Sequence, residues 1–138
     1  MEHEHPLIFG VPLHPILVHF PIAFYFLELL LLVFWLKKRD SQYLRFSRIA
    51  FSLGYFFMAA AALAGFRDAD GWKNITGMVR SHFYGAVSVI VFYTLRAVQL
   101  KMSKGEDARQ VAIQFLGALV GNFLVMLTGF YGGWLVYQ

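Results

Sequence analysis

The chain contains the stretch HPILVHFPIAFYFLELLLLVFWL at residues 14–36, a long apolar run that opens with two histidines and two prolines. With the histidines neutral, its only charged residue is Glu28. A segment of this length and apolarity is typical of a helix that spans a membrane. An imidazole is costly in a bilayer unless something binds it, so His14 and His19 are candidate site residues. The stretch therefore predicts a membrane span with a candidate site at its start.

The composition of the whole chain favours lipid as its solvent. Of 138 residues, 59% are hydrophobic and 14% are charged, whereas soluble proteins average about 25% charged residues. The chain has no cysteine, which excludes disulfides, iron–sulfur clusters, thiolate metal sites and covalently attached c-type haem. The net charge of +4 comes from cations in loops that flank apolar runs. These cations indicate membrane anchors, and we expect no nucleic-acid partner.

Four apolar runs predict one all-α, integral membrane four-helix bundle of up-and-down topology, formed by the single domain 1–138. The runs cover residues 13–36, 46–66, 83–100 and 111–137. The first and third loops are rich in lysine and arginine, whereas Asp68 and Asp70 offset the cations of the second, outer loop. The positive-inside rule therefore predicts a bacterial inner membrane protein with both termini periplasmic. The first residues lack a secretory signal, so we expect the first helix to be retained.

A pattern of histidine, tyrosine and charge repeats in the first and third runs. The two copies are His14, Tyr25 and Glu28, and His82, Tyr93 and Arg96. In each copy the tyrosine follows the histidine by eleven residues and the charge follows by three more, so the three side chains share one helix face. The two helices run in the same direction and lie diagonally opposite in such a bundle, so we expect these faces to meet in the core.

The opposite charges of the two copies would then lie level with each other. An unpaired charge at mid-membrane costs about 3 kcal/mol or more, so a structural ion pair of Glu28 with Arg96 is the simplest expectation. Two alternatives remain open from the sequence. In the first, Glu28 is part of a proton relay. In the second, Arg96 reaches the inner membrane interface and leaves Glu28 protonated.

Small residues line the second and fourth runs. In the second, Gly54, Ala61 and Gly65 share one face with Met58, and in the fourth, Gly117, Gly121, Gly129 and Gly133 are spaced by multiples of four. Such stripes let helices approach closely in lipid. They would also leave room for a flat cofactor between the first and third spans.

The histidines are the candidate cofactor ligands. His14 and His82 lie at matched depth on matched faces, and helix bundles hold haem iron between two such histidines. His19 points about 140° away from His14 on an ideal helix, and would turn inward only if Pro21 bends the turn. We therefore expect His82 and either His14 or His19 as iron ligands. Two alternatives are a capping or interfacial role, and a zinc, copper or non-haem iron site completed by an outer-loop aspartate.

Three motifs and one histidine together resemble those of a known family. The motifs are HPILVHFPI at 14–22, GFRDADGW at 65–72 and GFYGGWLVY at 129–137, and His82 opens the third run. They resemble a bacterial family of small four-helix predicted membrane proteins, a domain of unknown function, over nearly the whole chain. The resemblance implies a cytochrome b-like role. Family members usually carry an acid where Trp134 stands and continue into a His-Gly-Val tail, so this chain has membrane-level histidines for one bis-histidine haem, not two.

Three functions remain open from the sequence. The first is a membrane electron-transfer subunit, an oxidoreductase component, that holds a single b-type haem near the periplasmic face and exchanges electrons with a quinone or a periplasmic redox protein. The second is a cofactor-free accessory subunit that packs on other subunits of a larger respiratory or photosynthetic membrane complex. The third is a membrane enzyme with a histidine-bound metal. Nucleotide- and phosphate-binding motifs are missing from the sequence.

Overall fold

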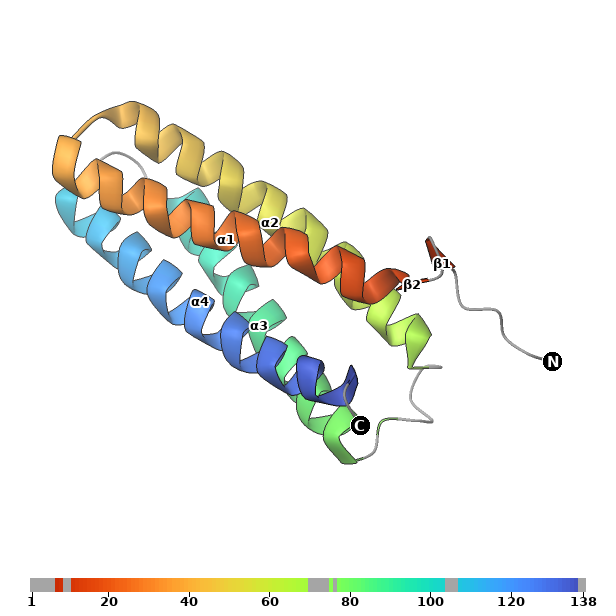
Figure 1. Cartoon of the computed structure of the whole chain (residues 1–138). Helices are drawn as coiled ribbons and strands as arrows, with labels where there is room; N and C mark the ends of the chain where they lie inside the picture. The colour runs from red at the N-terminus through yellow and green to blue at the C-terminus, as the bar shows by residue number, and fades with distance from the viewer. Residues whose placement is uncertain (1–6, 9–10, 70–74, 76, 104–106, 137–138) are drawn as a thin grey trace.

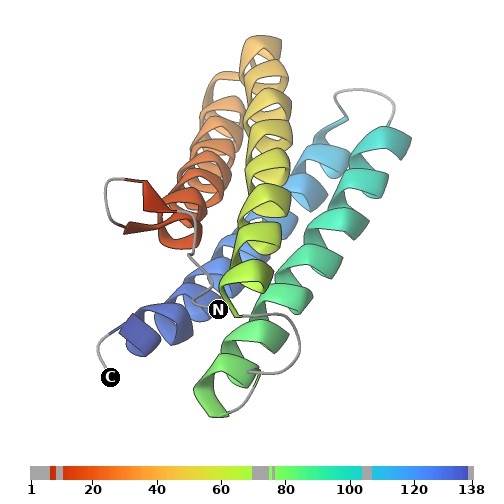
Figure 2. The ribbon, with the colours of Figure 1, turned by 90° about the vertical axis from the view of Figure 1, so that its right-hand side faces the viewer.

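Four long helices dominate the computed structural model, which describes residues 7–8, 11–69, 75, 77–103 and 107–136 (Figure 1). The helices are α1 (Leu13–Lys38), α2 (Ser41–Asp68), α3 (Gly77–Met102) and α4 (Ala108–Val136). All four are long and apolar enough to cross a membrane. Two short antiparallel strands, β1 (Leu7–Ile8) and β2 (Val11–Pro12), precede α1 and lie beside its start (Figure 2). The predicted all-α membrane bundle is confirmed.

The helices extend beyond the apolar runs that predicted them. The connection between α1 and α2 is only two residues long: Arg39, with a left-handed φ of 56°, and Asp40, whose carboxylate accepts a hydrogen bond from the Gln42 amide at 2.9 Å. This contact caps the start of α2. The apolar pattern marks only the part of a helix that lies in hydrocarbon, whereas backbone hydrogen bonding continues to the caps. The predicted end of the fourth run, Tyr137, lies outside the described residues.

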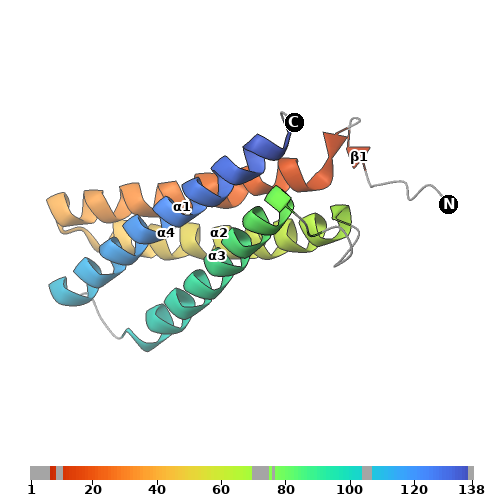
Figure 3. The same cartoon turned by 90° about the horizontal axis from the view of Figure 1, so that it is seen from below.

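The bundle consists of two hairpins, α1–α2 and α3–α4, which cross each other rather than run parallel (Figure 3). Contact between the hairpins is made chiefly by α1 and α4, whereas α2 and α3 touch little. We call the end with the α1–α2 and α3–α4 connections the connection end. The opposite end, with the start of α1 and the end of α4, is the terminal end (Figure 1).

A few polar and charged side chains lie in the otherwise apolar core of the bundle, and many large apolar side chains lie on its outside. The buried polar and charged residues include Glu28, Arg96 and Gln114, whereas apolar side chains such as Phe56 and Leu63 are exposed at 66% and 71%. A soluble protein rarely exposes so much contiguous apolar surface. Together with the four candidate spans, this distribution fits a multi-pass protein surrounded by a lipid bilayer.

Candidate functional site

His14 and His82 meet at the terminal end of the bundle. His14 is the second residue of α1 and His82 the sixth of α3. Their ring centroids lie 6.0 Å apart, with the ring planes inclined at 78°. Both side chains are half-buried. The repeat in the sequence thus brings one histidine from each hairpin to a common point.

Each histidine is anchored by a backbone carbonyl of the other helix of its own hairpin. The Nδ1 atom of His14 lies 2.7 Å from the Ala61 carbonyl oxygen of α2. The Nδ1 atom of His82 lies 3.0 Å from the Thr128 carbonyl oxygen of α4. A carbonyl oxygen only accepts, so each Nδ1 carries the proton and donates it, which leaves Nε2 of the neutral ring with a free lone pair. Metal-binding histidines are oriented in this way by their outer-shell partners.

A glycine lies against each ring, one helical turn beyond the carbonyl that anchors it. A methyl group at Gly65 would lie 2.7 Å from Nδ1 of His14. A methyl group at Gly132 would lie 2.8 Å from Cε1 of His82. Such distances are far below van der Waals contact, so each ring packs directly on helix backbone. The two glycines form equivalent seats for the two rings.

The glycine stripe predicted for the fourth run is wrong at its terminal end. Gly129 and Gly133 have open space where a side chain would project, whereas Gly132 packs against His82. Each step of four residues turns an α-helix by about 400°, so a stripe of fours drifts by about 40° per step. Gly133 therefore lies about 160° around the helix from Gly117. Thr128 and Gly132 stay on the core side, and the pattern of fours missed them.

His19 does not join the two other histidines. Its side chain is exposed, and its Nδ1 atom lies 2.6 Å from the carbonyl oxygen of Pro15 in the preceding turn. The helix α1 continues through Pro21, and the contact with Pro15 keeps the exposed His19 ring away from the core. Within the part of the chain that the structure describes, no three histidine, aspartate or glutamate side chains gather into a metal site. The geometry thus provides two converging histidines rather than three.

The aspartates of the expected outer loop are only partly described. Asp68 is the last residue of α2, and its two carboxylate oxygens are buried with no hydrogen-bond partner among residues 7–8, 11–69, 75, 77–103 and 107–136. Asp70 lies outside the described residues. Asp68 is thus at the terminal end, as expected, but it makes no described cluster with the histidines.

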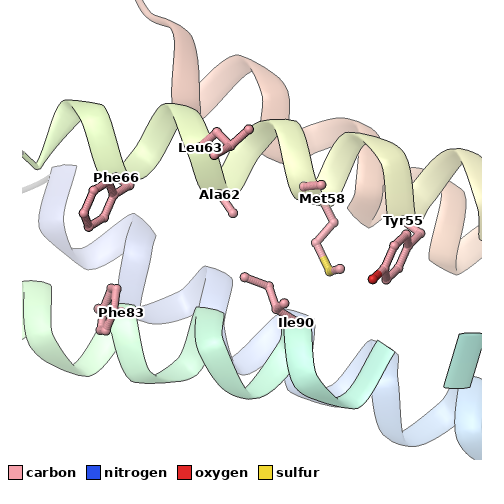
Figure 4. A pocket seen from close by; sticks show the side chains of 8 residues that line it. Tyr55, Met58, Ala62, Leu63, Phe66, Phe83 and Ile90 are labelled. Atoms are coloured by element: carbon pink, nitrogen blue, oxygen red, sulfur yellow. The ribbon is translucent and has the colours of Figure 1, made fainter. Parts of the chain in front are cut away.

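An apolar groove with a volume of about 420 Å³ runs between α2 and α3. It is lined by Tyr55, Met58, Ala59, Ala62, Leu63 and Phe66 of α2 and by Phe83 and Ile90 of α3 (Figure 4). Ala62 follows the residue that anchors His14, and Phe83 follows His82. At the other end of the groove, the Tyr55 hydroxyl and Thr94 Oγ1 are hydrogen-bonded at 3.0 Å. The groove exists because the crossed hairpins leave α2 and α3 apart.

The charges of the repeat form a buried ion pair. Two Arg96 nitrogens, Nη1 and Nη2, donate to the two Glu28 carboxylate oxygens at 3.0 and 2.8 Å, and Nη2 also donates to the Gln114 carbonyl oxygen at 3.1 Å. Between this pair and the histidines, the rings of Tyr25 and Tyr93 stack at 3.7 Å with planes inclined by 15°. Of the arrangements that the sequence left open, the structure contains the paired one.

Comparisons with known proteins place the chain in a family without assigning it an activity. No curated protein and no solved structure matches it. A family model described as a predicted membrane protein matches residues 10–138, which include all four helices. The description agrees with the four candidate spans. The chain therefore belongs to the predicted membrane protein family DUF2231.

Proposed function

We propose that the protein is a membrane electron-transfer subunit that holds one b-type haem between His14 and His82. The observation that carries this proposal is the matched anchoring of the two rings, each with Nδ1 on a carbonyl, which leaves the lone pair of a neutral ring on Nε2. If the Nε2 atoms of both rings held one iron, with bonds of about 2 Å, the ring centroids would lie about 6 Å apart. The observed separation is 6.0 Å.

The groove between α2 and α3 suits the flat, apolar body of such a cofactor. Its volume of about 420 Å³ lies within the range of about 300–1,000 Å³ for ligand pockets. Apolar and aromatic side chains line it, and two of them, Ala62 and Phe83, directly follow Ala61 and His82 in the sequence (Figure 4). The residues present therefore fit haem better than a small metal ion, which would need a third ligand from the described residues.

The chain's own residues would hold and orient the group. The carbonyls of Ala61 and Thr128 fix the ring tautomers, and Gly65 and Gly132 set the distance of each ring from its neighbouring helix. The Glu28–Arg96 pair keeps α1 and α3 in register, so the two histidines stay level. Bound haem supplies one-electron chemistry whose potential depends on its ligands and surroundings. The protein supplies an apolar environment and a fixed ligand geometry.

The orientation in the membrane completes the proposal. The connection end carries Lys37, Lys38 and Arg39 at the α1–α2 turn and Lys101 at the end of α3. The positive-inside rule then assigns this end to the cytoplasm of a bacterial inner membrane and the terminal end to the periplasm. The histidine pair would lie near the periplasmic face, where a quinone or a periplasmic redox protein can exchange electrons with the site.

An absorption spectrum tests this function. The protein is produced with haem available and purified in mild detergent. We expect a Soret band and, after reduction, sharp α and β bands. All three bands should be lost in His14→Ala and in His82→Ala. His19→Ala is the matched control, because His19 is exposed and faces away from the pair, and its spectrum should be unchanged.

Two other results of this experiment would support the two other functions that the sequence left open. A colourless protein with stoichiometric metal would support the membrane metalloenzyme. A colourless, metal-free protein that co-purifies with a large complex would support the cofactor-free accessory subunit. Either result overturns the haem proposal, and so does a haem spectrum that survives both His14→Ala and His82→Ala.

A further inference from the structure

A row of buried polar atoms leads from the ion pair toward the connection end. The atoms are Nε of Arg96, Nε2 of Gln114, Oε1 of Gln110 and Nε1 of Trp35, each buried and without a hydrogen-bond partner in the described parts of the chain. The residues Arg96, Gln114 and Trp35 are only 4%, 2% and 4% exposed. These groups lie outside the histidine site.

The four side chains lie between the level of the ion pair and the connection end. Gln114 is level with Arg96, because its carbonyl oxygen accepts a hydrogen bond from Nη2 at 3.1 Å. Gln110 lies one turn, about 6 Å, nearer the connection end on the same face of α4. Trp35 belongs to the same apolar cluster as Val111, the residue after Gln110. Since α4 begins at Ala108, the row starts within a turn of the surface.

Unpaired polar atoms in a membrane-embedded core need an internal partner. Lipid offers none, and buried polar groups that are left unpaired in proteins are normally satisfied by ordered water. The row contains three N–H donors and one amide oxygen acceptor. An anion would satisfy only the donors and would lie close to the Glu28 carboxylate. Water accepts from the N–H groups and donates to the amide oxygen, so it alone suits the whole row.

We propose that a file of water molecules runs from the connection end to the Glu28–Arg96 pair. The file ends at the stacked rings of Tyr25 and Tyr93, which are fully buried and fill the core on the other side of the pair. The Tyr93 hydroxyl, which also has no hydrogen-bond partner in the described parts of the chain, belongs to this boundary. The ion pair is thus open to water, and to protons, from one face of the membrane only. This water site does not depend on whether haem binds at the terminal end.

The chain has no cysteine, so a single introduced thiol gives an unambiguous infrared probe of local water. The S–H stretch is followed after transfer into D2O for Gln114→Cys and Gln110→Cys. The controls are Ala118→Cys, one turn farther from the connection end and 0% exposed, and Ile113→Cys, next to Gln114 but 47% exposed toward lipid. We expect both glutamine positions to exchange at least about ten-fold faster than both controls. Equal rates at Gln114→Cys and Ala118→Cys would overturn the proposal.

A second measurement leaves the chain unaltered, in case a thiol disturbs the core. In protein labelled with ¹⁵N at glutamine, the side-chain amide of Gln114 should give NMR cross-peaks to water. Gln42, which is exposed at the start of α2, is the positive control. Cross-peaks from Gln42 without any from Gln114 would show a dry core and contradict the water file.

Discussion

The two hairpins carry the same residue type, histidine, at the terminal end and opposite charges at mid-membrane. His14 and His82 each bind a carbonyl within their own hairpin, whereas Glu28 and Arg96 bind each other across the two hairpins. The two histidines are therefore held in the same way in both hairpins. The opposite charges of Glu28 and Arg96 fix how the two hairpins face each other, because two like charges at this depth would repel.

The repeat also extends into the second helix of each hairpin. Tyr25 and Tyr93 pack on Gly54 and Gly121, as His14 and His82 pack on Gly65 and Gly132. Each of these four rings thus has a glycine opposite it on α2 or α4. This pairing of ring with glycine brings the helices of each hairpin close together and leaves the rings facing the common core.

Removing one charge of the cross-hairpin pair should have the largest effect on stability. Glu28→Leu or Arg96→Leu leaves the partner buried and uncompensated, which should cost about 3–5 kcal/mol of the free energy of unfolding. The double variant removes both charges and should recover most of that loss, since a well-packed apolar pair often replaces a buried ion pair without penalty. Denaturant unfolding in detergent measures each variant. Single variants that cost under about 1 kcal/mol would show that the pair does not hold the hairpins together.

A methyl group at either ring seat should have the next largest effect. Gly65→Ala and Gly132→Ala push a ring away from helix backbone, which should cost about 1–3 kcal/mol each. Equal losses would support the equivalence of the two hairpins. Gly133→Ala is the matched control, because nothing lies near its side-chain position, and it should be neutral or stabilise by up to about 1 kcal/mol through helix propensity. A similar loss in the control would refute the ring-seat argument.

Helix periodicity made the faces of α1 and α3 predictable. The steps of three and four residues put histidine, tyrosine and charge on one face, and in the structure those residues stack, pair or meet across the core. The direction of His19 followed from the same geometry as long as α1 stayed straight. The alternative, in which a bend at Pro21 turns the ring inward, is not what the structure contains, because the His19 ring is exposed and contacts the Pro15 carbonyl.

The carbonyl anchors and the groove could not be predicted from the sequence. A backbone carbonyl has no side-chain signature, so nothing in the sequence marks Ala61 or Thr128 as the partner of a histidine. The groove depends on the crossing of the two hairpins, which is set by packing over whole helices rather than by any one residue. The position of Gly132 could have been predicted, because a period of 3.6 residues rather than four puts it on the core face of the helix.

A hydrogen bond present on only one side of the repeat should contribute a smaller amount. The Asn122 side-chain amide of α4 donates to the Tyr25 carbonyl oxygen of α1 at 3.1 Å. Interhelical hydrogen bonds in membranes contribute about 0.6 kcal/mol on average, so Asn122→Leu should lower the free energy of unfolding by about that amount. Detergent unfolding against the unaltered protein measures it. A loss above about 2 kcal/mol would mean that this contact, rather than the ion pair, joins the hairpins.

The smallest effect should distinguish the two stacked tyrosines. The Tyr25 hydroxyl lies 3.5 Å from the Met58 sulfur and donates to it, so Tyr25→Phe should cost about 0.5 kcal/mol. The Tyr93 hydroxyl is buried with no partner in the described parts of the chain, so Tyr93→Phe should be neutral or slightly stabilising, because no hydrogen bond is lost. Both variants keep the ring stack, so each is the control for the other in detergent unfolding. A larger loss in Tyr93→Phe than in Tyr25→Phe would mean that ordered water reaches beyond Arg96, and that the stack does not close the water file.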